Sequence, residues 1–155
     1  MGPYLDMTIY FQSDRDQPYG CFSTHSSHGF QLDQRWWATC EHYFQAQKFA
    51  GTRHVEAIRH AKTAQQAVTL GRDRARLLRA DWDAIKEAVM YRAVRCKFAT
   101  HNDIRTLLLS TGEELLVANL TNDYYWGSGF DGSGQNRLGQ ILMTLRTQLR
   151  AESEA

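Results

Sequence analysis

The sequence predicts a compact α+β domain that is mostly helical with a few short strands. The expected strands gather near the N-terminus and recur once near the C-terminus, so they do not alternate with the helices as in βαβ folds. The chain has 155 residues, of which 43% are apolar and 23% charged. A chain of this length buries a core without disulfides or metals. We therefore expect one domain over residues 1–155, with its core at about residues 8–150.

Short strands are expected in the first forty residues. Residues 8–11 favour a strand, and Pro18-Tyr19-Gly20 signals a turn. The segments 30–32 and 35–37 flank Asp33-Gln34, which predicts a tight hairpin, although Gln is a poor substitute for glycine at the second turn position.

Six helices follow from capping residues and apolar periodicity. N-cap residues mark the starts of four of them, since their side chains accept hydrogen bonds from the first helical N–H groups. These caps are Thr39, Thr63, Asp81 and Asn102. The expected helices are about 41–49, 54–60, 64–71, 82–98, 102–111 and 137–150, with a strand at 114–118 and a frayed tail after the last helix. In the fourth, a stripe of Ile85, Val89, Ala93 and Cys96 is expected to be buried.

Composition excludes several classes of protein. The 18 basic and 17 acidic residues give a net charge of +1, whereas a general nucleic-acid binder is usually far more basic. No apolar run reaches the roughly 20 residues that span a bilayer. The first ten residues carry Asp6 and no basic cluster, unlike a signal peptide.

The cysteines and histidines give no metal signal. Cys21, Cys40 and Cys96 are odd in number and far apart, which fits neither a disulfide framework nor a zinc knuckle and indicates the reducing cytoplasm. His25 and His28 are three residues apart, but no Cys or acidic partner completes a ligand set. We expect no metal and no cofactor.

The segment EHYFQAQKF carries the first candidate site. On a helix, Glu41, Gln45 and Lys48 fall on one polar stripe flanked by Phe44 and Phe49. One interpretation is a solvated face with a Glu–Lys pair. The other is a carboxylate and an amine held between aromatic rings, where their pKa values are tuned for catalysis.

The segment GRDRARLLRADW, residues 71–82, carries the second candidate site. Its arginines are Arg72, Arg74, Arg76 and Arg79. They form either a surface cluster or a set of guanidinium groups that bind phosphate oxygens bidentately. Trp82, which follows them, is either a core residue or a stacking platform for a flat ligand.

The segment NDYYWGSGFDGSGQN, residues 122–136, matches G-x-G-x-x-G literally. We reject a dinucleotide fold, because no buried strand runs directly into it and no βαβ unit surrounds it. It remains a glycine-rich loop that leads to the last helix and can approach a ligand closely. Alternatively, it is a turn in which the side chains of Asp123 and Asp131 form hydrogen bonds with the backbone of the same segment.

Read in order, these segments resemble one family. The segments PYGCFS, WWATCEHYFQAQKF, LGRDR, LRADWDAIKEAVMYRAVRCKF, LLLSTG and NDYYWGSGFDGSGQNRLGQILMTLR together resemble the YbiA-like, or NADAR, proteins from Tyr10 to Arg150. The resemblance implies a compact α+β fold that hydrolyses N-glycosidic bonds. One branch of the family releases ribose 5-phosphate from the first two intermediates of riboflavin biosynthesis. Another removes ADP-ribose from the exocyclic amine of guanine in DNA, as an antitoxin to DNA-modifying toxins.

The resemblance also implies roles for individual residues. Catalytic roles fall to Glu41, Lys48 and Asp123. Among the expected substrate-binding residues, the resemblance carries over Trp82. The other expected substrate-binding residues are Phe22, Ser23, Gln45, Arg72, Arg74, Arg79, Tyr125, Trp126, Gly127 and Asn136. The chain departs from the pattern at Phe22-Ser23-Thr24-His25, where the family often has Phe-Ser-Asn-Phe, and at Trp37-Ala38-Thr39, where it has Trp-Pro-Thr. The first departure concerns the ligand contacts of that loop.

Three hypotheses follow for the function. The leading one is an N-glycosidase on small phosphorylated ribosylamino-pyrimidines, in which Glu41 activates water or Lys48 forms a Schiff base with the opened sugar. The second is a hydrolase of ADP-ribosyl-guanine, which would make DNA a substrate and a toxin a partner. The third is a module that only binds ADP-ribose. None of the three requires a membrane.

Overall fold

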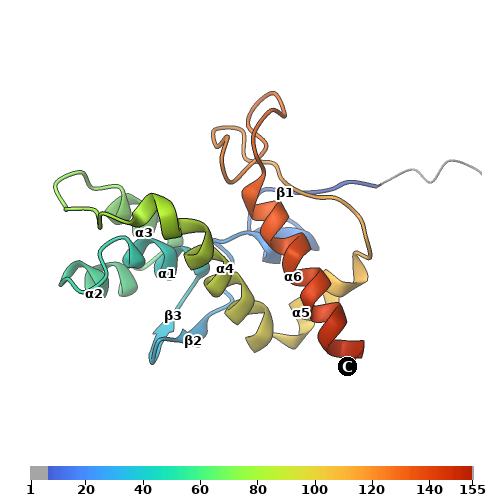
Figure 1. Cartoon of the computed structure of the whole chain (residues 1–155), viewed down its shortest axis with the longest axis horizontal. Coiled ribbons are helices and arrows are strands. Elements are labelled where there is room, and N and C mark those ends of the chain that lie inside the picture. Colours follow the sequence, from blue (N-terminus) through green and yellow to red (C-terminus); the bar gives the residue numbers. More distant parts are fainter. Residues whose placement is uncertain (1–6, 155) are drawn as a thin grey trace, which may run out of the picture. The chain divides into compact units, whose positions relative to one another are not determined.

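The computed structural model describes residues 7–154, and it has the expected α+β fold class (Figure 1). The chain divides into two compact units. The first combines the segment that ends at Ser23 with the segment from Asn102 onward, and the second comprises Thr24–His101.

In the second unit, the hairpin forms as predicted. Strand β2 (Phe30–Leu32) pairs antiparallel with β3 (Arg35–Trp37), and Phe30 lies opposite Trp37. Both turn residues take left-handed backbone conformations, with φ of 53° at Asp33 and 65° at Gln34. Such conformations normally favour glycine or Asn. Here the Asp33 carboxylate offsets the strain, because it accepts hydrogen bonds from the Tyr43 hydroxyl at 2.8 Å and from Arg92 at 2.7 Å.

Four helices complete this unit: α1 (Cys40–Gln47), α2 (His54–Arg59), α3 (Ala64–Gly71) and α4 (Trp82–Thr100). The N-caps Thr39 and Thr63 are confirmed, since their side chains accept from the N–H groups of His42 and Gln66. Asp81 precedes α4, but its carboxylate pairs with Arg79 and makes no side-chain cap. Helix α1 packs against α2, α3 and α4, so it is the central helix of the unit (Figure 1).

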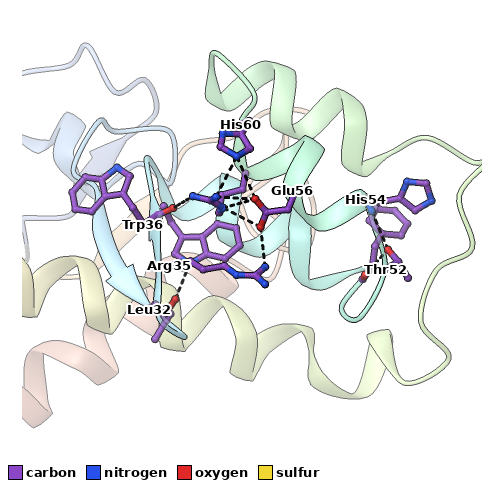
Figure 2. A network of polar contacts seen from close by, with 10 residues as sticks. Leu32, Arg35, Trp36, Thr52, His54, Glu56 and His60 are labelled. Carbon is purple, nitrogen blue, oxygen red and sulfur yellow. Dashed lines mark hydrogen bonds and ion pairs between the residues drawn. The ribbon is translucent and has the colours of Figure 1, made fainter.

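A surface network joins α2 to strand β3. Figure 2 shows that Arg35 and His60 converge on Glu56, at 2.9 Å and 3.2 Å. Arg59 also pairs with Glu56, at 2.7 Å, and reaches the Trp36 carbonyl. Hydrogen bonding from Arg59 lowers the pKa of Glu56. The network therefore joins α2 to β3, and both of these elements also contact α1.

The first unit is built on a parallel strand pair. Strand β1 (Ile9–Phe11) pairs with β4 (Leu116–Ala118), with Ile9 opposite Leu116. Helix α5 (Asn102–Ser110) packs against α6 (Arg137–Glu154), and α6 also covers β4. The expected turn near Pro18 is followed by a short 3₁₀ helix at Tyr19–Phe22.

Two expectations about the helices are wrong. The expected stripe of α4 is only partly buried, because Ile85, Val89 and Cys96 are half-buried. The residues buried on α4 are instead Trp82, Met90, Ala93, Val94, Lys97 and Phe98. Helix α6 continues to Glu154, where a frayed tail was expected after residue 150. Within residues 7–154, none of the helices is both long and apolar enough to cross a membrane.

Candidate functional site

Both carboxylate oxygens of Glu41 are held by neighbouring side chains. The Thr24 hydroxyl donates to Oε1 at 2.9 Å, and the Gln45 carboxamide donates from Nε2 to Oε2 at 3.0 Å. The backbone N–H of Glu41 also donates to the Thr24 carbonyl, at 3.2 Å. At position 24 a threonine hydroxyl supplies this donor. The solvated-face interpretation therefore does not describe Glu41, whose carboxylate is fixed in orientation.

The start of α1 is held by a buried histidine. His42 Nε2 lies 2.9 Å from the Ala61 carbonyl, and Nδ1 lies 2.8 Å from the Thr39 hydroxyl. Because a carbonyl can only accept, Nε2 carries the proton and Nδ1 accepts from Thr39. Burial lowers the pKa of His42, which favours this neutral form. His42 thus anchors the turn that carries Glu41.

Lys48 follows α1 and is half-buried. Its Nζ donates to the Gly71 carbonyl at 3.3 Å and lies 5.9 Å from the centre of the Phe44 ring. Burial lowers the pKa of Lys48, nearby Glu41 partly opposes this, and Arg72 lowers it further. A lower pKa raises the fraction of neutral amine, which is the nucleophilic form. The ion pairs among the described residues do not include one between Glu41 and Lys48.

Gly71, the last residue of α3, contacts the side chains that surround Glu41 and Lys48. A Cβ placed on Gly71 would lie 2.0 Å from Gln45 Oε1, whereas its carbonyl receives the Lys48 ammonium. Gln45 is only 4% exposed, and its Oε1 has no hydrogen-bond partner within the described residues. Helix α3 can therefore approach α1 this closely only because residue 71 has no side chain.

Replacing Gly71 by alanine is expected to lower kcat by about ten- to a hundredfold, because the new methyl group displaces Gln45 and hence Glu41. Steady-state kinetics and a thermal melt would be measured for Gly71→Ala. The matched control is Gln65→Ala, at an exposed position of the same helix. Unchanged kcat in Gly71→Ala would show that this close contact does not position Glu41.

The arginines of residues 71–82 differ in their contacts and in their exposure to solvent. Arg79 forms a bidentate pair with Asp81, at 2.6 Å and 3.1 Å, and donates to the Gln47 carbonyl at 3.3 Å. Arg72 and Arg74 are exposed. Trp82 is 6% exposed and packs on Phe44 with ring centres 4.9 Å apart, so most of its ring surface is already covered.

The glycine-rich loop lies in the first unit and is ordered by its own side chains. Asp123 Oδ1 accepts from the N–H groups of Tyr125 at 3.0 Å and Trp126 at 2.8 Å. The Tyr125 and Trp126 rings contact edge to face, with centres 4.9 Å apart. Asp123 therefore stabilises a turn through hydrogen bonds to nearby backbone N–H groups, which is the alternative that the sequence left open. Its predicted catalytic role stays a prediction.

The other predicted residues of this unit have structural contacts. Asn136 accepts from the Ala118 N–H and donates to the Leu116 carbonyl, both at 2.9 Å, so its carboxamide is bound to β4. A Cβ on Gly127 would lie 2.5 Å from the Leu120 side chain, which explains the glycine there. Phe22 is 1% exposed and packs edge to face on Phe11, and Ser23 is also buried.

The structure thus brings Glu41, Gln45 and Lys48 together with Thr24 and Gly71 in the second unit. Sequence reasoning missed Thr24, His42 and Gly71 as parts of this site. Only His42 had a local signal, because it lies three residues after the cap Thr39. Among residues 7–154, no group of three or more His, Cys, Asp or Glu side chains could hold a metal ion.

Nearly the whole chain is similar to known proteins. The family model described as the NADAR domain matches residues 10–150. An N-glycosidase of Nostoc punctiforme is 49% identical over 93% of this chain and 94% of its own length. The N-glycosidase YbiA of Escherichia coli is 46% identical over 95% of this chain and 91% of its own.

A solved structure and a plant protein extend the comparison. The NMR structure of E. coli YbiA matches with a TM-score of 0.88 and 45% identity, over 96% of this chain and 88% of that one. The chloroplastic riboflavin biosynthesis protein PYRR of Zea mays is 38% identical over 96% of this chain, which corresponds to 26% of the maize protein.

Proposed function

The chain belongs to the NADAR family, and from this premise we propose that it is an N-glycosidase of phosphorylated ribosylamino-pyrimidines that releases ribose 5-phosphate. The observation that carries the proposal is an oriented carboxylate on α1 together with a half-buried amine on Lys48, the residue that directly follows this helix. Glu41 is fixed through both oxygens, and Lys48 is held by the Gly71 carbonyl.

These two groups suit cleavage of a ribosylamine by either of two routes. Glu41 can take a proton from water as the water attacks the anomeric carbon, while the pyrimidine amine leaves with the bonding electrons and is protonated. Alternatively, the sugar ring opens and the Lys48 amine displaces the pyrimidine amine to give a Schiff base, which water then hydrolyses. Both routes develop positive charge at the anomeric carbon, which the Glu41 carboxylate stabilises.

Similarity to named proteins supports the substrate class. The relatives from Nostoc punctiforme and E. coli are named N-glycosidases, and relatives from maize and Vibrio vulnificus are named riboflavin biosynthesis proteins. The net charge of +1 favours a small substrate over extended DNA. The arginine segment begins next to Lys48 and supplies groups for a phosphate.

The test offers the protein three substrates side by side and follows sugar release by chromatography and mass spectrometry. They are a ribosylamino-pyrimidine 5′-phosphate, the same compound without phosphate, and an oligonucleotide with ADP-ribosylated guanine. We expect the first to be cleaved with the highest kcat/KM and the second with a raised KM. Preferential release of ADP-ribose from the oligonucleotide would instead establish the second hypothesis, and binding of ADP-ribose without any cleavage would establish the third.

A further inference from the structure

The loop of residues 72–81, which carries the arginines, starts and ends beside Lys48. At its start, Lys48 Nζ donates to the carbonyl of Gly71 at 3.3 Å. At its end, the Arg79 backbone N–H donates to the carbonyl of Lys48 at 3.0 Å. Both ends of this loop are therefore hydrogen-bonded to Lys48, one to its amine and the other to its backbone carbonyl.

The arginines of the loop differ in what their guanidinium groups already bind. Arg79 would have to give up a bidentate pair with Asp81 at 2.6 Å and 3.1 Å to bind a ligand. Arg72 and Arg74 are exposed, so water competes with any anion and an ordered side chain loses entropy on binding. Arg76 is the intermediate case, because 16% of its side chain is exposed.

The Arg76 guanidinium is partly buried and poorly paired. Its Nε lies 3.6 Å from Asp73 Oδ2, which is beyond a good hydrogen bond. Asp73 uses its other oxygen, Oδ1, to accept from the Ala75 N–H at 2.9 Å. Arg76 Nη1 is inaccessible to solvent and has no hydrogen-bond partner within the described residues. Native structures rarely leave such a donor unsatisfied, so it calls for a partner.

We propose that Arg76 binds the phosphate of the substrate, with Nη1 donating to a phosphate oxygen after a small rotation of the side chain. This assignment rests on the proposed function for the identity of the ligand. The rotation gives up the long contact with Asp73 and provides Nη1 with an acceptor. A partly buried guanidinium binds phosphate more strongly than an exposed one, because water screens the pair less. From sequence alone, all four arginines are candidates for binding phosphate, and the expected substrate-binding residues include Arg72, Arg74 and Arg79 but not Arg76.

The test measures binding of ribose 5-phosphate and of unphosphorylated ribose by calorimetry. Arg76→Gln is expected to weaken ribose 5-phosphate about ten- to a hundredfold and to leave ribose unchanged. Arg53→Gln removes the same charge from an exposed position of the same unit and is the matched control. Arg76→Lys keeps the charge without the forked donors and is expected to fall in between. If Arg76→Gln does not fold, as a thermal melt would show, Arg76→Lys carries the test.

Several results would overturn the assignment. It fails if Arg72→Gln or Arg74→Gln abolishes ribose 5-phosphate binding while Arg76→Gln retains it, or if ribose binding falls equally in Arg76→Gln. It also fails if wild type turns over the ribosylamino-pyrimidine 5′-phosphate and Arg76→Gln leaves its KM unchanged. A failure of the proposed function alone would give another result. Wild type would not cleave the substrate, whereas Arg76→Gln would still selectively lose binding of ribose 5-phosphate.

Discussion

Replacing Glu41 by glutamine is expected to lower kcat about a thousandfold, within the range for loss of a general base, without changing the fold. The structure explains why the fold survives. The new carboxamide oxygen can accept from Gln45 Nε2, and the new amide group can donate to Thr24, whose hydroxyl rotates to accept. Steady-state kinetics and a thermal melt of Glu41→Gln check both parts.

A matched control shows whether the expected loss of kcat is specific to the Glu41 carboxylate or follows from replacing any helical glutamate. Glu56 is the helical glutamate of the surface network in Figure 2, and it contacts Arg35, Arg59 and His60. Glu56→Gln is therefore expected to retain wild-type kcat. Retention of kcat by Glu41→Gln as well would remove Glu41 from the chemistry.

Replacing Lys48 by alanine is expected to lower kcat by about a hundredfold or more, whether the amine acts as nucleophile or as a positioned charge. The two roles are distinguished by borohydride, which reduces a Schiff base to a stable amine. Burial lowers the pKa of Lys48, so a larger neutral fraction is available near pH 7 than for an exposed lysine. The trapped fraction should rise with pH until the amine is fully neutral.

Peptide mass spectrometry after borohydride treatment during turnover locates the adduct. We expect it on Lys48, and we expect Lys62→Ala, which alters an exposed lysine before α3, to be trapped like wild type. An adduct on another lysine would exclude Lys48 as the nucleophile. Absence of any adduct, with full activity of Lys48→Ala, would leave the direct hydrolytic route through Glu41.

The parts of the fold that could be predicted are those with local causes. Thr39 and Thr63 accept from N–H groups three residues on, so sequence alone identifies them as caps. Asp81 carried the same local signal, but its carboxylate is bound by Arg79, and α4 starts without a side-chain cap. The stripe of α4 was wrong because the burial of residues such as Met90 and Phe98 depends on which elements pack around the helix, and periodicity does not specify those.

In the candidate site too, local features could be predicted and contacts between distant residues could not. Glu41, Gln45 and Lys48 were predicted on one stripe because the expected helix covered all three, and Lys48 in fact directly follows α1. Their partners were not predicted, because Thr24 lies 17 residues from Glu41 and Gly71 lies 23 residues from Lys48. No periodicity joins positions so far apart in the sequence. Arg76 could not be singled out among the four candidate arginines for a related reason, since arginines of one segment cannot be ranked until their partners are known.

The central claim is that this chain cleaves the N-glycosidic bond of a phosphorylated ribosylamine through Glu41. The most direct measurement is a ³¹P NMR time course of a ribosylamino-pyrimidine 5′-phosphate with wild type and with Glu41→Gln at equal concentration. The account predicts that wild type converts the substrate signal into that of ribose 5-phosphate at a rate proportional to enzyme, and that Glu41→Gln leaves the substrate signal in place. No conversion by wild type, or equal conversion by both proteins, would contradict it.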